Sequence, residues 1–124
     1  MTVHGSIEFT IVERSEERVI AEMPILVGIK NPFGVVHAGA IVWFADVTAT
    51  VLVRGSDHAS EGMTGFPLAI TLNANFLRNQ PEGSLKAIAS FVKRGRTVSV
   101  VRTAVYGDSG KLMAEVTTSH VLST

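Results

Sequence analysis

The sequence contains no cysteine, which excludes disulfides, thiolate metal sites and a cysteine nucleophile. It also lacks an excess of either charge: 11 basic residues balance 11 acidic ones, so neither nucleic acid nor an anionic membrane is expected as a partner. Residues 1–10 carry neither a basic region nor an apolar segment, so no secretory signal is visible and a cytoplasmic location is expected. The longest apolar stretch is interrupted by an aspartate and two threonines, which argues against a membrane span.

What the chain has in abundance is apolar side chains. Hydrophobic residues make up 46% of its 124 residues, and the mean hydropathy is +0.32. No linker, repeat or low-complexity tract divides the sequence, so residues 1–124 are expected to form one domain. A small domain has much surface for its volume, so part of this apolar area is expected to meet a second copy of the chain.

The pattern predicts two strands, one long helix and four more strands. Residues 40–54 contain neither glycine nor proline; they would span about 22 Å as a helix but about 50 Å as a strand, which is too long for a small domain. Gly55 supplies the helix stop, and a glycine-rich loop follows over 55–65. The predicted strands cover 5–13, 18–23, 67–78, 84–94, 97–107 and 111–122. Short turns at 79–83, 94–96 and 107–110 predict antiparallel hairpins. The expected architecture is α+β, a sheet of about six strands around one helix.

One residue on the predicted helix stands out. Asp46 is the only charged side chain between Ala38 and Val53, and an ionised carboxylate in apolar surroundings is expensive without a partner or a task. Helical spacing puts Gly39, Asp46 and Thr50 on one stripe, where Thr50 could hold the carboxylate or a water. An apolar setting would raise the pKa of Asp46, as suits a catalytic acid or base.

The start of this helix offers a second chemical element. Near His37, Ala38 and Gly39 the first backbone N–H groups are unpaired and the helix dipole is positive, which suits an oxyanion. The side-chain amide of Asn31 could donate to the same oxygen. A carbonyl polariser together with the Asp46 carboxylate is sufficient for acyl transfer or hydrolysis.

The motif N-x5-H-A-G-x6-D-x3-T, followed by LNANFLR, G-x-L-x-A and the basic turn KRGR, resembles the hotdog-fold acyl-CoA thioesterases over residues 7 to 121. The subgroup it is most similar to is the phenylacetate-degradation type. The resemblance implies hydrolysis of acyl-CoA thioesters on a sheet wrapped around a central helix. It also implies a homodimer, possible further pairing to a tetramer, and an active site at the dimer interface.

The resemblance also assigns roles. Asn31 matches an amide that contacts the thioester carbonyl, and Ala38 matches the backbone N–H of an oxyanion hole, with His37 before it and Gly39 after it. Many members have glycine in place of Ala38, and a helical φ would preserve the donor. Asp46 matches the catalytic carboxylate, which acts as general base or nucleophile.

Further residues follow from the same resemblance. Thr50 matches a hydroxyl that steadies the carboxylate, and the basic turn residues Lys93, Arg94 and Arg96 match contacts to the phosphates of coenzyme A, which is part of the substrate. No separate cofactor is expected. The four histidines (His4, His37, His58 and His120) lack metal-ligand spacing, so no metal site is expected. Apolar candidates for the acyl pocket are Phe33, Trp43, Phe66 and Leu68.

Plainer interpretations of the same residues remain open. Asp46 could form a structural ion pair with Arg54 or with a strand arginine. Asn31 could be a turn residue, Thr50 could bond its own helix backbone, and the basic turn could simply be solvated. Two other functions also remain open. One is a hotdog hydratase or dehydratase, which would use a histidine with a carboxylate; the other is a non-catalytic acyl-CoA binder, which gains nothing from a desolvated charge.

Overall fold

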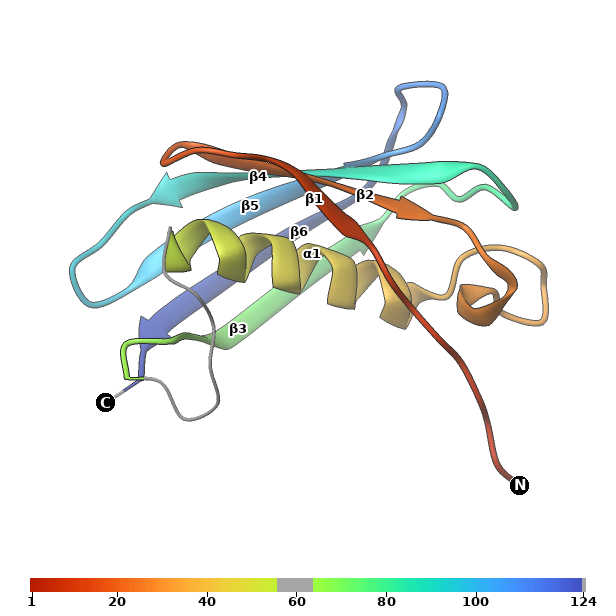
Figure 1. Ribbon diagram of the computed structural model, residues 1–124, viewed down its shortest axis with the longest axis horizontal. Coiled ribbons are helices and arrows are strands. Elements are labelled where there is room, and N and C mark those ends of the chain that lie inside the picture. Colours follow the sequence, from red (N-terminus) through yellow and green to blue (C-terminus); the bar gives the residue numbers. More distant parts are fainter. Residues whose placement is uncertain (56–63, 124) are drawn as a thin grey trace.

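The computed structural model describes residues 1–55 and 64–123, and in it one antiparallel sheet wraps around a single long helix (Figure 1). The glycine-rich loop expected at 55–65, with His58, lies mostly outside the described residues. The elements in chain order are β1 (Thr10–Arg14), β2 (Arg18–Pro24), the 3-10 turn η1 (Val27–Ile29), α1 (Ala38–Arg54), β3 (Pro67–Phe76), β4 (Ser84–Lys93), β5 (Ser99–Tyr106) and β6 (Leu112–Leu122).

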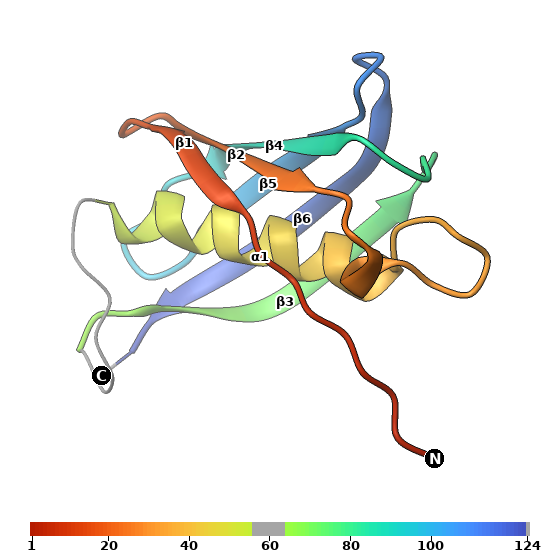
Figure 2. The same ribbon diagram turned by 45° about the vertical axis from the view of Figure 1, so that its right-hand side comes forward.

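The strand order across the sheet is β1-β2-β4-β5-β6-β3, and every neighbouring pair is antiparallel. The hairpins predicted at 94–96 and 107–110 are confirmed, because β4 pairs with β5 and β5 with β6. The hairpin predicted at 79–83 is wrong. β3 pairs with β6 at one edge of the sheet, so this link crosses the ends of β5 and β6 to reach β4. Figure 2 shows the result, with β3 on one side of α1 and β1 and β2 on the other.

Helix α1 forms where the sequence predicts it and ends at the predicted glycine. Gly55 ends it with a φ of 74°, and the Gly55 N–H donates to the carbonyl of Val51 at 3.1 Å. The buried residues recur at helical spacing (Ile41, Phe44, Ala45, Thr48, Ala49, Val51 and Leu52) and face the sheet. Small side chains on the facing strands, among them Ala21, Ala87 and Ala89, are fully buried and let the helix lie close to the sheet.

The first strand is shorter than predicted. Strand β1 begins at Thr10, and residues 5–9 extend beyond it without a strand partner, because β2 leaves the sheet at Pro24. The segment crosses α1 instead (Figure 1). The Ser6 N–H donates to the carbonyl of Gly28 at 3.1 Å, and the ring of Phe9 lies edge-on to Trp43. The alternating pattern of 5–9 therefore reflects packing on the helix.

Strand β3 has a free edge in the single chain. It carries no charged side chain, and its apolar residues Leu68, Ile70, Leu72 and Phe76 are between 41% and 55% exposed. An uncharged strand of 10 residues with unpaired backbone groups is a template for pairing with another chain. In the described part of the chain, no helix is both long and apolar enough to cross a membrane.

Candidate active site

The loop before α1 is a closed hairpin built on the sequence NPFG. The Gly34 N–H donates to the carbonyl of Asn31 at 2.9 Å, and proline and glycine occupy the positions such a turn favours. Gly34 has a φ of 97°, which glycine tolerates. The side-chain oxygen of Asn31 accepts from the Val35 N–H at 3.3 Å, so Asn31 is indeed a turn residue. Its amide nitrogen has no partner among the described residues and remains a free donor.

A second asparagine, which the sequence did not single out, bonds this loop to the segment that follows β3. The Asn79 side chain donates to the carbonyl of Val36 at 2.9 Å and accepts from the Val36 N–H at 3.2 Å. Val36 is 1% exposed, so both backbone groups would otherwise be buried without partners. The His37 N–H donates to the carbonyl of Ile29 at 2.7 Å. These bonds set the position at which the helix begins.

The helix start has the arrangement expected for an anion or carbonyl site. The His37 carbonyl accepts from the N–H groups of Ala40 and Ile41, while the N–H groups of Ala38 and Gly39 have no partner in the described part of the chain. His37 is the N-cap residue, and its side chain makes no capping bond. Donors at a helix N-terminus, where the dipole is positive, stabilise a developing negative oxygen.

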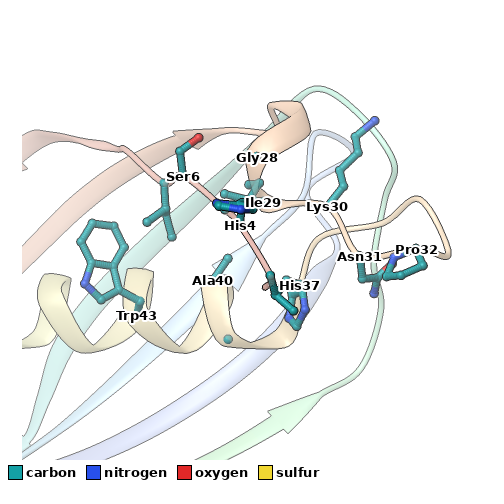
Figure 3. A pocket seen from close by; sticks show the side chains of 14 residues that line it. His4, Ser6, Gly28, Ile29, Lys30, Asn31, Pro32, His37, Ala40 and Trp43 are labelled. Carbon is teal, nitrogen blue, oxygen red and sulfur yellow. The ribbon is translucent and has the colours of Figure 1, made fainter. Parts of the chain in front are cut away.

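His37 and Gly39, together with Asn31, line a pocket of about 650 Å³, whereas Ala38 and Asp46 are not among its lining residues (Figure 3). Its wall includes Ile7 and Gly28 on the side of the N-terminal segment and Asn31, His37, Gly39 and Trp43 on the other. Of the four apolar residues expected to line an acyl pocket, only Trp43 does so here. Phe33 is 89% exposed at the tip of the loop, and Phe66 and Leu68 belong to the region of β3.

Asp46 lies at the middle of α1 and is half-buried. Its Oδ1 is buried and has no hydrogen-bond partner, and neither of the two ion pairs between described residues includes it. The ion pair with Arg54 considered above is therefore absent from the described structure. Burial raises the pKa of Asp46, while the charge of His120 lowers it to a smaller extent. A carboxylate whose conjugate acid is less acidic than usual is a better base.

The threonine expected to support Asp46 makes no bond to it. Thr50 lies one turn further along α1 and is half-buried, but no hydrogen bond of its side chain occurs among the described residues. It is Thr48 that bonds the helix backbone, donating to the carbonyl of Phe44 at 2.7 Å. Thr50 therefore does not hold the carboxylate in this structure.

Within one chain, the two parts of the candidate site, the start of α1 and Asp46, lie far from each other. Seven residues separate Gly39 from Asp46, which corresponds to about 10 Å along the helix axis. A thioester carbonyl cannot touch the N–H donors of the helix start and the Asp46 carboxylate of the same chain at once, since a reacting atom must lie about 3 Å from each.

The basic turn lies beyond the other end of the helix. Arg94 donates through Nη2 to the Glu16 carbonyl, and its guanidinium lies 4.4 Å from the centre of the Phe91 ring, so part of its role is structural. Lys93 and Arg96 are exposed, and neither is in an ion pair among the described residues. Arg94 also lines a pocket of about 510 Å³, and two further arginines, Arg14 and Arg54, line the same pocket.

The Thioesterase superfamily model matches residues 33–114. The proposed esterase ComA2 of Bacillus subtilis is 34% identical over 113 residues, which are 90% of this chain and 86% of ComA2. The 1,4-dihydroxy-2-naphthoyl-CoA hydrolase of Escherichia coli is 23% identical over 108 residues, 87% of this chain and 76% of the hydrolase.

Solved structures with the same fold include a thioesterase of Staphylococcus aureus, with a TM-score of 0.85 at 21% identity over 94% of this chain and 93% of that one. A Streptococcus mutans protein bound to acetyl-CoA gives a TM-score of 0.83 at 20% identity over 94% and 89% of the two chains. The sheet wrapped around one helix is therefore the hotdog fold. Because the family model covers most of the chain and ComA2 matches nearly all of it, the chain belongs to the thioesterase superfamily and is an enzyme of that family.

Proposed function

We propose that the protein hydrolyses acyl-CoA thioesters to the free acid and coenzyme A, with Asp46 as the acid/base group or nucleophile. The N–H groups of Ala38 and Gly39 and the amide of Asn31 polarise the thioester carbonyl. Acting as base, Asp46 takes a proton from water as the water oxygen attacks the carbonyl carbon. The C–S bond then breaks, and the departing thiolate takes up a proton. Acting as nucleophile, Asp46 instead forms a mixed anhydride that water hydrolyses.

The observation that carries this proposal is the state of Asp46 in a chain of the thioesterase superfamily. Its buried Oδ1 lacks a partner, and burial raises its pKa. Leaving a buried acceptor unsatisfied costs about 1–3 kcal/mol, and more if it is charged. A structural aspartate would have an ion pair or hydrogen bonds to offset this cost, whereas a catalytic one finds its partner in the water or substrate.

The site is proposed to form between two copies of the chain, so that Asp46 faces the Asn31 and Ala38 of the second copy. Within one chain, Asp46 and the helix start are about 10 Å apart, too far to act on one carbonyl. The apolar edge of β3 is free to pair with a second copy. The basic turn also lies at the opposite end of α1 from the pocket. If two β3 edges pair antiparallel, the two helices run in opposite directions. The Asp46 of each copy can then approach the helix start of the other. Further pairing to a tetramer remains part of the proposal.

The substrate class is proposed from the same pocket. The resemblance to the phenylacetate-degradation subgroup suggests an aryl or other apolar acyl group, and Trp43 at the pocket wall is suited to stack on a ring. The aromatic acyl group in the name of the Escherichia coli relative is consistent with this. Lys93 and Arg96 are the free cations of the basic turn and are proposed to contact the phosphates of coenzyme A, with Arg94 contributing beside its structural contacts.

The two alternatives fit the site less well. A hydratase would use an imidazole and a carboxylate at the substrate, whereas the match to the thioesterase family and a relative named as a CoA hydrolase favour hydrolysis. A non-catalytic binder leaves the unpartnered Asp46 carboxylate unexplained.

The test is release of free thiol from a panel of acyl-CoA substrates that varies in chain length and includes aryl groups. Asp46→Asn and Asp46→Ala should each lower kcat by about 100-fold or more. The matched control, Glu22→Gln, neutralises an exposed carboxylate on β2 and should leave the rate unchanged. Full activity of Asp46→Asn would refute the assignment. Hydration of an enoyl-CoA without thiol release would instead indicate the hydratase, and tight binding without any turnover would indicate the binder.

Mixing two inactive variants tests the shared site. A dimer of one Asn31→Ala chain and one Asp46→Asn chain has one site with both wild-type residues and one site with neither. After exchange of subunits, about a quarter of the wild-type activity should return, because half of the dimers are mixed and half of their sites are intact. No recovery, with exchange demonstrated, would mean that both residues act in the same chain.

A further inference from the structure

The end of α1 that is remote from the candidate pocket lies between two turns of the sheet. Figures 1 and 2 show the turn between β1 and β2, the end of α1 and the turn between β4 and β5 at one end of the molecule. Two cavities, of about 510 Å³ and about 150 Å³, lie in this region. Val53 and Arg94 line both of them, so the two cavities adjoin, and together we name them the basic groove.

Four arginines line the basic groove. Arg14 and Arg54 line the larger cavity, Arg96 lines the smaller one, and Arg94 lines both. Among the described residues, Glu16 is the only acidic residue that lines either cavity, and none of these five side chains is in an ion pair. The groove therefore has an excess of positive charge that the described part of the chain does not neutralise. Such a concentration of cations attracts anionic ligands.

The other polar groups around the groove do not compensate for this charge. In the turn between β1 and β2, Glu13 is in an ion pair at 2.9 Å with an arginine of β2, and Glu17 is exposed and lines neither cavity. The wall of the smaller cavity also includes Thr97 and Ser99, which bring hydroxyl groups, and the buried His120, which brings an imidazole. Groups of these kinds can donate hydrogen bonds to an anion.

Arg54 is the arginine that most clearly lacks a partner. Its Nε is buried without a hydrogen-bond partner, and its side chain makes no hydrogen bond to any described residue. An arginine that only stabilised the C-terminus of a helix would bond the free carbonyls of the last turn. Arg94, in contrast, donates to the Glu16 carbonyl and lies over the Phe91 ring, 4.4 Å from its centre. These contacts fix Arg94 between the two cavities, which lowers the cost of binding a ligand there.

The basic groove lies on the same stripe of α1 as Asp46. Val53, which lines both cavities, follows Asp46 by seven residues, just as Asp46 follows Gly39, and seven residues are close to two helical turns. Arg54 lies about 12 Å beyond Asp46 along the helix axis. The pantetheine arm of coenzyme A is about as long as four or five extended residues, which is about 15 Å. A thioester beside Asp46 can therefore place the phosphates of its coenzyme A in the groove.

We infer that the basic groove binds the phosphate groups of coenzyme A, and that Arg14 and Arg54 contact them in addition to the basic turn. This inference rests on the proposed function, because it assigns the groove to the same substrate. Coenzyme A carries a diphosphate and a separate 3′-phosphate on one ribose, and two adjoining cavities that share Arg94 fit two such groups. The larger cavity, lined by three arginines, takes the diphosphate, and the smaller one takes the 3′-phosphate beside Arg96.

Thioesters with and without phosphates test the two new contacts. The KM of Arg14→Gln and of Arg54→Gln is measured for an acyl-CoA and for the same acyl group on pantetheine, which has no phosphate. Each variant should raise the KM for acyl-CoA about 10-fold with little change in kcat, because it removes a charged donor to the bound phosphates. The KM for acyl-pantetheine should stay the same, which also shows that the variant is folded.

Arg78→Gln is the matched control, since Arg78 is exposed, lines neither cavity and makes no side-chain hydrogen bond within the described residues. It should change neither KM. A rise of the same size for both thioesters, or an acyl-CoA KM that stays unchanged in Arg14→Gln or in Arg54→Gln, would overturn the inference.

A thioester of dephospho-CoA, which lacks only the 3′-phosphate, tests which cavity takes which group. Arg96→Gln should raise the KM for acyl-CoA but not for the dephospho-CoA thioester, whereas Arg54→Gln should raise both. The reverse pattern would overturn the assignment of the two cavities.

A binding measurement without turnover separates this inference from the proposed function. In isothermal titration calorimetry at low salt, coenzyme A should bind the wild type and should bind Arg54→Gln about 10-fold more weakly. Absence of binding to the wild type would overturn the inference. Inorganic diphosphate that bound as tightly as coenzyme A would show that the groove takes a free anion, which would also overturn it. If the wild type releases no thiol from any acyl-CoA but binds coenzyme A through Arg54, the proposed function fails while the groove stands.

Discussion

The Asn79 clamp allows a prediction whose magnitude follows from the structure. Asn79→Ala removes both bonds to the backbone of Val36, at 2.9 and 3.2 Å, together with a bond from the Gln80 N–H at 2.9 Å. Each intramolecular hydrogen bond contributes about 1 kcal/mol net, and a buried backbone group left unpaired costs about 1–3 kcal/mol. The Gln80 bond is exposed and counts for little. We therefore expect the free energy of unfolding to fall by about 2–3 kcal/mol.

The same substitution should also lower the rate of thioester hydrolysis. Val36 directly precedes the N-cap of α1, so a loosened loop moves the donors at Ala38 and Gly39. A displacement of about 1 Å can cost up to about 100-fold in rate, and we expect kcat to fall more than KM rises.

The assays are urea denaturation of the variant and thiol release under conditions in which it is fully folded. Arg78→Ala is the matched control, an exposed neighbour whose side chain makes no hydrogen bond within the described residues. The reasoning is refuted if Asn79→Ala and Arg78→Ala unfold at the same urea concentration. A stability loss with an unchanged kcat would refute only the link to the helix start.

Three further predictions concern the N-terminal segment and Asp46. Phe9→Ala removes a ring whose centre lies 5.0 Å from that of Trp43, so the free energy of unfolding should fall by about 2 kcal/mol in urea; no change would show that the ring contact is not formed in solution. Gly28→Ala places a Cβ 2.8 Å from the Ser6 carbonyl oxygen, so the N-terminal segment has to move. KM for acyl-CoA should change, and a protease should cleave the first residues faster than in the wild type. Identical digestion of the two proteins would contradict the contact. Because protonation removes the base and burial raises the pKa of Asp46, kcat/KM should fall with decreasing pH at a midpoint above the range of an exposed aspartate; a midpoint at or below that range would contradict this.

The local elements were predictable where one signal dominated. The absence of glycine and proline over 40–54 defined α1, and Gly55 ended it as expected. The link at 79–83 was misread because a short polar turn does not reveal which strands become neighbours in a sheet that curves around a helix. Residues 5–9 alternate like a strand, but no strand edge extends far enough to pair with them.

For the candidate site, too, some residues could be predicted from the sequence and others could not. The sequence placed Asn31, His37 and Gly39 together, and the pocket brings them together because they lie in one loop and the helix turn that follows. The catalytic roles remain predictions. Asn79 could not be found from the sequence, since it bonds the backbone of a residue 43 positions away and belongs to no local motif. Only the fold makes it a neighbour of the site.

The crossing of α1 by residues 3–9 has a consequence for how this enzyme can be altered. That segment lines the pocket beside Trp43 yet contributes nothing to the hydrogen-bonded ladder of the sheet. Its side chains can therefore be exchanged to widen or narrow the pocket while the scaffold that carries Asp46 keeps its shape. The shape of the pocket and the architecture of the sheet are thereby encoded in separate parts of the polypeptide.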